Sequence, residues 1–272
     1  MPLLLPYIVY SDKKEEERLD MDNHIPEVFR EFQNTIKEMN AVHTEKIGEQ
    51  DTLETKMLDS EVRNDIQGFE GRDVVVFGNP IEIGEKLDHL QGDNPYFAGG
   101  NCGLVSTANF LNLCGISAAD ENMITKYAID HDECMHGWFV PFASRGGVTT
   151  ENEQKIIKDF GIGTNVFQTF EPGGSIEDIA RQIEAGYVGI MGVNAGYLWD
   201  DPGCVEDGFM DHDVTLTGTV RDAQTGELLG ITICDSGDRK ACDVLSLDKL
   251  QQCYVDIPGA RVIFSDSPMR VV

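Results

Sequence analysis

Residues 99–115 read GGNCGLVSTANFLNLCG, and this stretch does most to decide the fold. From Cys102 onward apolar residues fill a helix-length run, and Gly115 stands where a helix commonly stops. The sequence therefore predicts a helix that begins at Cys102. Gly100 and Gly103, on either side of that start, are small enough to let the backbone of a bound molecule come close.

Among the seven cysteines of the chain, Cys102 is the best candidate for a nucleophile. The N-terminal end of a helix carries partial positive charge, which favours a thiolate over a thiol. A glycine-flanked cysteine ahead of a helix is, taken alone, more often just a buried small residue. The assignment therefore needs a base and an orienting group elsewhere in the chain.

The rest of the chain divides into earlier helices and later strands. Apolar periodicity and capping residues predict further helices over 121–129, 149–162 and 175–186. Short runs rich in Val and Ile predict strands over 73–78, 187–193, 213–220, 228–234 and 260–265. Helices followed by antiparallel strands indicate the α+β class.

His212 and Asp235 are the candidates for the base and the orienting group. His212 opens a predicted strand in MDHDVTLTGTV, and its acidic neighbours Asp211 and Asp213 should favour the imidazolium form. Asp235 follows the strand GITIC and precedes the turn SGD, so its carboxylate should lie at a strand edge. A carboxylate in that position can fix the orientation of an imidazole.

The strings NCGLVSTANFLNLCG, GGVTTENEQKIIKDFGI, SIEDIARQIEAGYVGIMGV, DHDVTLTGTV and ICDSG occur in this order. Together they resemble the papain-like cysteine peptidases of the bacteriocin-leader-processing (double-glycine) type and the papain-fold domains of bacterial polymorphic toxins. The resemblance covers roughly residues 88–266. It implies a papain-like fold, in which a central helix carries the nucleophile Cys102 and packs on an antiparallel sheet that supplies His212 and Asp235.

The chain departs from that family pattern at two points. Asp211 stands before the histidine, where the family has glycine. The family's oxyanion donor is a glutamine about six residues before the nucleophile, whereas Gln91 lies eleven before Cys102, with the loop GDNPYFAGG between them. Gln91 is the preferred donor together with the Cys102 backbone N–H, and Asn101 is the substitute.

The resemblance implies a cysteine endopeptidase that hydrolyses peptide bonds with a Cys-His-Asp triad, as a processing domain or a bacterial toxin or effector. Its substrate would be a protein or peptide. Glutamine deamidases and transglutaminases use the same triad on the same scaffold, so a deamidase-like effector stays open. A non-catalytic protein-binding module is the third alternative, although it would have little need of all three triad residues.

The first ninety residues find no counterpart in the resemblance, and we expect residues 1–80 to form an acidic, mainly helical segment and residues 81–272 the hydrolase domain. The run SDKKEEERLDMDN should be a solvated linker or a fraying helix start, and apolar residues at helical spacing follow from Ile25. This segment could inhibit the enzyme or dock an inhibitory or carrier protein.

Composition restricts the partners and the compartment. A formal net charge of −27 makes binding to nucleic acid unfavourable. The start MPLLLPYIVY lacks the basic region of a signal peptide, and no apolar run is long enough to span a membrane. We expect a cytoplasmic protein, or one secreted by a route that needs no signal peptide.

Two acidic loops resemble metal sites without matching any. His131, Cys134 and His136 in DHDECMH fit no common zinc module, and GYLWDDPGCVEDGFMDHD lacks the ligand spacing of a calcium loop. We predict no metal and no cofactor. The second loop should instead cover the active site, where Trp199 and Asp211 would contact substrate and Asp200 and Asp201 would favour basic substrates.

Overall fold

The computed structural model describes residues 57–202 and 208–271. The predicted N-terminal helix from Ile25 and the charged run before it lie outside these residues, and so does Cys204. The described residues belong to one compact unit, Leu53–Val272. Among them, no helix is long and apolar enough to cross a membrane.

The helices are α2 (Pro80–Gly84), α3 (Cys102–Leu113), α4 (Glu121–Asp130), α5 (Thr150–Asp159), α6 (Ile176–Glu184), α7 (Ala195–Leu198) and α8 (Leu247–Leu250). A 3₁₀ turn, η1, spans Phe142–Ser144, and α8 continues into a π-helical turn, η3, over Gln251–Val255. The strands are β1 (Ser60–Arg63), β2 (Val74–Phe77), β3 (Thr164–Gln168), β4 (Gly189–Val193), β5 (His212–Asp222), β6 (Leu228–Asp235), β7 (Lys240–Ser246) and β8 (Arg261–Ser265).

All strands pair antiparallel in one eight-stranded sheet. The order β1-β2-β5-β4-β8-β3 forms one path, and β6 and β7 extend from β5. The long strand β5 is central: its first residues pair with β4, its last residues pair with β2, and β6 runs along its other edge. Both ends of β5 are therefore fixed, including the end that begins with His212.

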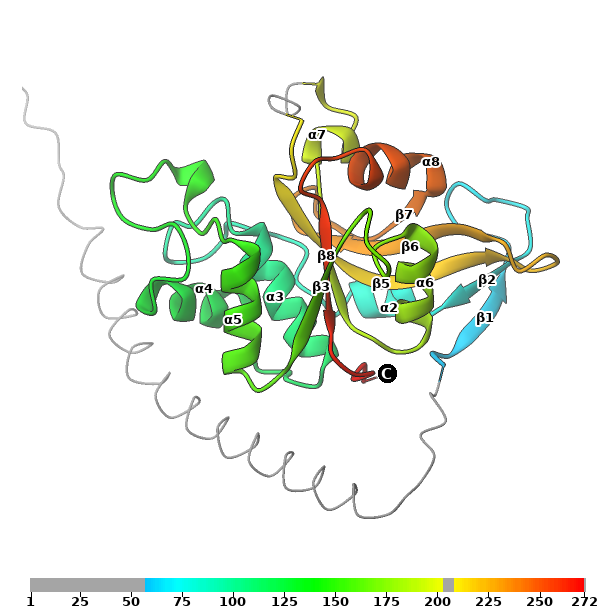
Figure 1. The fold of residues 1–272 in the computed structure, drawn as a ribbon, viewed down its shortest axis with the longest axis horizontal. Coiled ribbons are helices and arrows are strands. Elements are labelled where there is room, and N and C mark those ends of the chain that lie inside the picture. Colours follow the sequence, from blue (N-terminus) through cyan, green and yellow to red (C-terminus); the bar gives the residue numbers. More distant parts are fainter. Residues whose placement is uncertain (1–56, 203–207, 272) are drawn as a thin grey trace, which may run out of the picture. The chain divides into compact units, whose positions relative to one another are not determined.

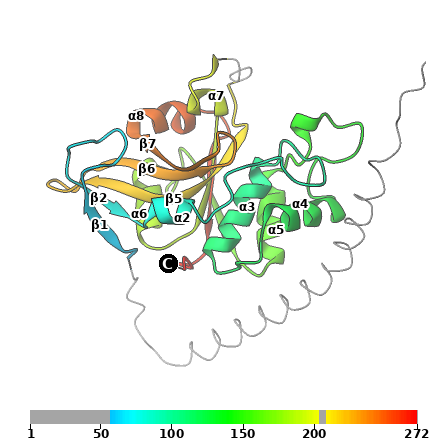
Figure 2. The same cartoon turned by 180° about the vertical axis from the view of Figure 1, so that it is seen from behind.

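Helix α3 packs against β5, α4 and α5, and these three helices lie together beside the sheet (Figures 1 and 2). Ten of its twelve residues are buried, so it is a core helix that is covered by protein on nearly every face. The predicted α+β class is confirmed. The helices expected over 121–129, 149–162 and 175–186 are also present as α4, α5 and α6, with Thr149 and Ser175 as side-chain caps.

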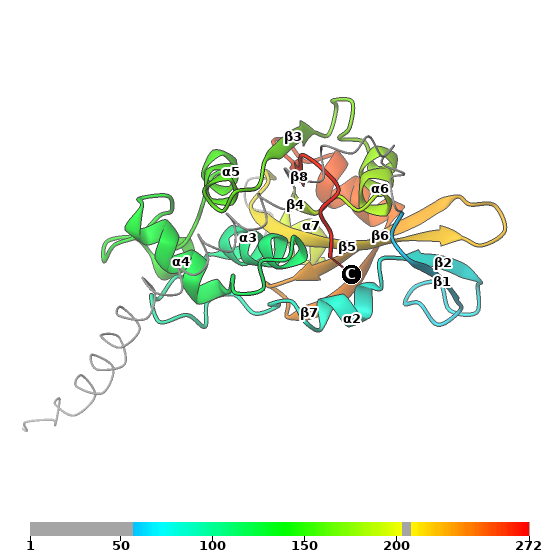
Figure 3. The same ribbon diagram turned by 90° about the horizontal axis from the view of Figure 1, so that it is seen from below.

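Strands β1 and β2 lie at the end of the sheet remote from α4 and α5 (Figure 3). Val74–Phe77 pair with Thr219–Asp222, and Leu58 is buried in the core with its N–H donated to the Glu184 carbonyl oxygen at 2.8 Å. The sequence-based division at residue 80 therefore falls after the first two strands of the sheet. Residues 57–79 contribute these two short strands and the turns around them, because the Val-rich run adds to the edge of β5.

Candidate active site

Cys102 is the first residue of α3 and is half-buried. The helix has no acidic residue in its first turn, and its N-cap, Asn101, makes no side-chain capping bond. The N-terminal amides of α3 are thus left to interact with negative charge that develops at this end. This is the position that the sequence predicted for the nucleophile.

His212 and Asp235 meet because β5 and β6 are antiparallel neighbours, with the start of β5 beside the end of β6. The register pairs Thr215 with Cys234. His212 Nε2 lies 2.7 Å from Asp235 Oδ1, and the two residues are 4% and 1% exposed. A hydrogen bond this short in a buried setting fixes the plane of the imidazole ring.

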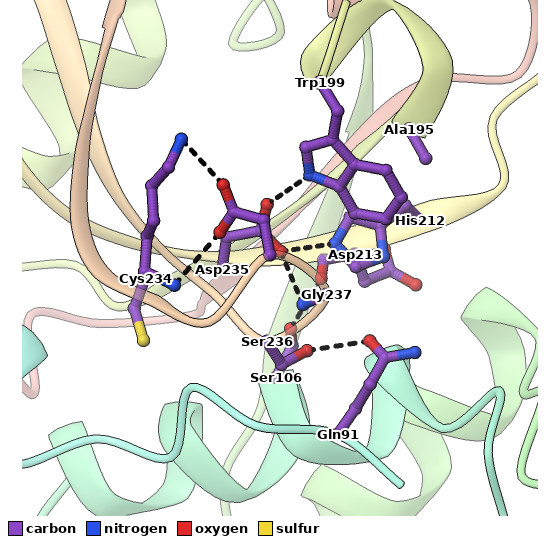
Figure 4. A network of polar contacts seen from close by, with 12 residues as sticks. Gln91, Ser106, Ala195, Trp199, His212, Asp213, Cys234, Asp235, Ser236 and Gly237 are labelled. Carbon is purple, nitrogen blue, oxygen red and sulfur yellow. Dashed lines mark hydrogen bonds and ion pairs between the residues drawn. The ribbon is translucent and has the colours of Figure 1, made fainter. Parts of the chain in front are cut away.

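Two further donors hold the Asp235 carboxylate in place (Figure 4). Trp199 Nε1–H donates to Oδ2 at 2.8 Å, and the Gly237 N–H donates to Oδ1 at 2.8 Å. The Trp199 ring also lies against the His212 ring, with centroids 5.1 Å apart. The carboxylate accepts three hydrogen bonds and is screened from water, so its orientation is set before any substrate arrives.

The environment of His212 favours its charged form. Burial alone lowers the pKa of His212, but the nearby Cys102 and the hydrogen bonds with Asp235 and Cys102 outweigh it and raise this pKa well above its usual range. Burial raises the pKa of Asp235, yet the bond from His212 and that from Trp199 bring it below the ordinary value. Because Asp235 occupies Nε2, Nδ1 is the nitrogen that is free to exchange a proton with Cys102.

Asp211 and Asp213 have other roles than the one predicted for them. Asp211 Oδ1 accepts the N–H of Ala195 at the start of α7 at 2.8 Å, and Asp213 forms an ion pair with Arg261. Their carboxylates are therefore engaged by other groups. The proximity of Cys102 and the bond with Asp235, more than these acids, raise the pKa of His212.

Gln91 is anchored to the residue after Asp235 and to the loop before Cys102 by three hydrogen bonds. Its Oε1 accepts from Ser236 Oγ at 3.1 Å (Figure 4). Its backbone N–H donates to the Ser236 carbonyl oxygen at 3.1 Å, and its Nε2 donates to the Gly99 carbonyl oxygen at 3.2 Å. The primary amide carries two hydrogens, so one remains for a substrate oxygen. The long spacing to Cys102 is accommodated by the loop 92–100.

Asn101 is fully buried, and its amide is directed into the protein. Its Nδ2 donates to Glu121 Oε1 at 2.6 Å and to Thr125 Oγ1 at 3.3 Å, which uses both hydrogens. Glu121 Oε1 also accepts from the Gly92 N–H and from Asn94 Nδ2, both at 2.9 Å. Asn101 therefore ties the loop before Cys102 to α4, and neither hydrogen of its amide is left for an oxyanion.

The two glycines around Cys102 are packed against protein. The Gly100 N–H donates to the Arg145 carbonyl oxygen at 2.8 Å, and a Cβ at Gly100 would lie 2.1 Å from the Ala143 carbonyl oxygen. A Cβ at Gly103 would lie 2.4 Å from Val148 Cγ1. Both positions need glycine because neighbouring segments approach the helix start, whatever a substrate requires.

Several residues that shape the site had no signal in the sequence. Ser106 Oγ donates to the Asp213 carbonyl oxygen at 3.0 Å, and Ser236 Oγ donates to Gln91 Oε1. Glu121 accepts hydrogen bonds from the loop that precedes Cys102. Each contact joins residues far apart in the chain. Only a known strand register could have predicted these pairs.

The two acidic loops that resemble metal sites hold no cluster of metal-ligating side chains within residues 57–202 and 208–271. His131 stacks on Tyr127, and His136 Nε2 contacts Asp132 Oδ1 at 2.6 Å. In the second loop, Asp200 forms an exposed ion pair with Lys249. The six cysteines of the described residues are all free thiols.

No family model and no curated protein matches the sequence. Among solved structures, the chain is similar to a candidate C39-like peptidase from Bacillus anthracis, with 18% sequence identity and a TM-score of 0.43. That match covers 61% of this chain and 88% of the other.

Proposed function

We propose that the protein is a papain-like cysteine hydrolase that cleaves peptide bonds, with Cys102, His212 and Asp235 as its triad. The observation that carries this proposal is the buried His212–Asp235 pair, whose free ring nitrogen serves the thiol at the start of α3. A nucleophile, a base and an oriented carboxylate are the three parts that covalent acyl transfer requires.

The reaction follows from the positions of these groups. The Cys102 thiolate attacks the substrate carbonyl, and the free hydrogen of Gln91 Nε2 and the Cys102 backbone N–H stabilise the oxyanion. The His212 imidazolium then donates its Nδ1 proton to the leaving amine, which leaves an acyl-enzyme. Water, deprotonated by the neutral His212, hydrolyses that thioester and restores Cys102.

Mass spectrometry of a protein lysate distinguishes the alternatives. The lysate is incubated with the wild type or with Cys102→Ala, and both new peptide termini and glutamine-to-glutamate conversions are scored. New termini seen only with the wild type are expected. Conversions without cleavage would make the enzyme a deamidase, and two identical samples from folded protein would favour a binding module.

We propose further that the segment before the described residues inhibits the enzyme or docks a partner protein. The test is a deletion that ends at residue 55, because Leu58 and strands β1 and β2 belong to the sheet. A higher rate after the deletion would support inhibition. An unchanged or lower rate from a folded product would count against it.

A further inference from the structure

A second buried polar cluster joins β8, β5 and α5 beside the start of α3. Arg261 on β8 forms ion pairs with Asp213 on β5 and Glu153 on α5, and its Nε donates to Thr150 Oγ1 at 2.9 Å. Arg261 and Glu153 are 2% and 0% exposed, and Asp213 is 7% exposed. The proposed mechanism gives no role to this cluster.

The charges in the cluster do not balance unless one carboxyl holds a proton. Two carboxyl groups share a single guanidinium, and each gives it one oxygen. The second oxygens, Glu153 Oε1 and Asp213 Oδ2, both face Gly103, at 2.8 Å and 3.2 Å from the position that a Cβ would take there. Glu153 Oε1 has no hydrogen-bond partner. An unpartnered carboxylate oxygen in full burial is costly, whereas a protonated oxygen becomes a donor to Asp213.

We propose that Glu153 is a positioning residue that acts as a neutral carboxylic acid hydrogen-bonded to Asp213. In this state it adds no net charge near the N-terminus of α3. The pair of Cys102 thiolate and His212 imidazolium is thereby preserved. The inference rests on the proposed function in that it assumes this ion pair. An ionised Glu153 would add a second negative charge beside the first turn of α3 and would disfavour the thiolate.

The charged groups that face Glu153 agree with this assignment. Burial raises the pKa of Glu153 well above its usual range, Arg261 opposes that effect, and the negative charges of Asp213 and Cys102 add to it. These groups come from β8, β5 and α3, the elements packed against this face of α5. One guanidinium is thus balanced by the Asp213 carboxylate alone.

Infrared spectroscopy at neutral pH tests the proton directly, without substrate. We expect a carbonyl band of a protonated carboxylic acid that shifts on labelling with carboxyl-¹³C glutamate and that Glu153→Gln removes. If the variant does not fold, the labelled wild type still decides whether a protonated glutamate is present. Absence of the band would overturn the proposal.

The pH dependence of Cys102 alkylation by iodoacetamide, read by peptide mapping, tests the effect on the thiolate. Glu153→Gln is neutral and of the same shape. The midpoint of its pH profile of Cys102 alkylation should therefore match the wild-type midpoint within about 0.3 pH unit, or a factor of about two in the ionisation constant. Glu153→Ala keeps the net charge but removes the hydrogen bond to Asp213, whose carboxylate then carries its full negative charge beside the α3 N-terminus, so the midpoint should rise by about one unit or more.

Glu184→Gln is the matched control, because Glu184 is a buried glutamate that pairs with Arg221 near the opposite end of β5. It should leave the Cys102 midpoint unchanged. A midpoint lowered by one unit in Glu153→Gln would show that Glu153 is ionised in the wild type. An unchanged midpoint in Glu153→Ala would show that the cluster has only a structural role. Failure of the proposed peptidase activity would alter neither readout.

Discussion

Ser106 Oγ on helix α3 donates a hydrogen bond to the backbone oxygen of Asp213 on strand β5, at 3.0 Å. The helix that begins with Cys102 is thereby fixed to the strand that begins with His212, one residue from the histidine itself. The distance between nucleophile and base depends on this contact because it joins the two elements directly.

Replacing Cys102 should abolish catalysis and spare the fold. Cys102→Ala removes the nucleophile from a half-buried position and leaves the packing of α3 intact. We expect the rate of peptide cleavage to fall by at least about 10³-fold, with an unchanged melting temperature. Cleavage by Cys102→Ala at the wild-type rate would refute the assignment of the nucleophile.

Asp235→Asn should slow catalysis through the imidazole. The amide still fits between Trp199 and Gly237. It no longer stabilises the imidazolium, and it no longer favours the neutral tautomer that carries its proton on Nε2. We expect kcat/KM to fall by roughly 10²- to 10⁴-fold. Trp199→Phe, which keeps an aromatic ring but loses the Nε1 donor, should cost less, and Trp138→Phe at an 89% exposed site is the control.

Activity should persist well above the ordinary titration range of histidine. The pKa of folded His212 is raised, so the imidazolium is lost only as pH rises through that higher value. The stability that this shift contributes is complete below the unfolded pKa of about 6.5 and disappears as pH rises through the folded pKa. A pH profile of kcat/KM should therefore place the alkaline limb well above pH 6.5, and Asp235→Asn should move it down.

Gln91→Ala should act on the rate rather than on substrate binding. The loss of the free Nε2 hydrogen removes one oxyanion donor, and such a donor is worth about 10²- to 10³-fold in kcat. KM should change little. The melting temperature serves as the check for structural damage, because Gln91 also joins Ser236 to the Gly99 carbonyl oxygen. An equal loss in Asn101→Ala with intact folding would point to Asn101 as the donor instead.

Gly103→Ala should destabilise the protein and reduce activity. The added Cβ would lie 2.4 Å from Val148 Cγ1 and 2.8 Å from Glu153 Oε1, in a buried site that has no room for it. Overpacking of this kind costs roughly 1–3 kcal/mol. Denaturant unfolding measures the loss, and wild-type stability would show that the helix start can shift away from α5.

The sequence by itself determined the α+β class, the capped helices α4, α5 and α6, and Cys102 as a helix start. It also pointed to His212 and Asp235, because strand ends and turn residues are local signals. These features follow from apolar periodicity and from capping chemistry over a few neighbouring residues.

Only the tertiary structure decided which distant residues meet. The addition of β1 and β2 to the sheet, the attachment of Gln91 to Ser236 and the burial of Glu153 against Arg261 all depend on strand register and on helix packing. Asp211 and Asp213 were assigned to His212 by adjacency, yet successive side chains in a strand point to opposite faces. Their partners, Ala195 and Arg261, come from other parts of the chain, which local patterns do not encode.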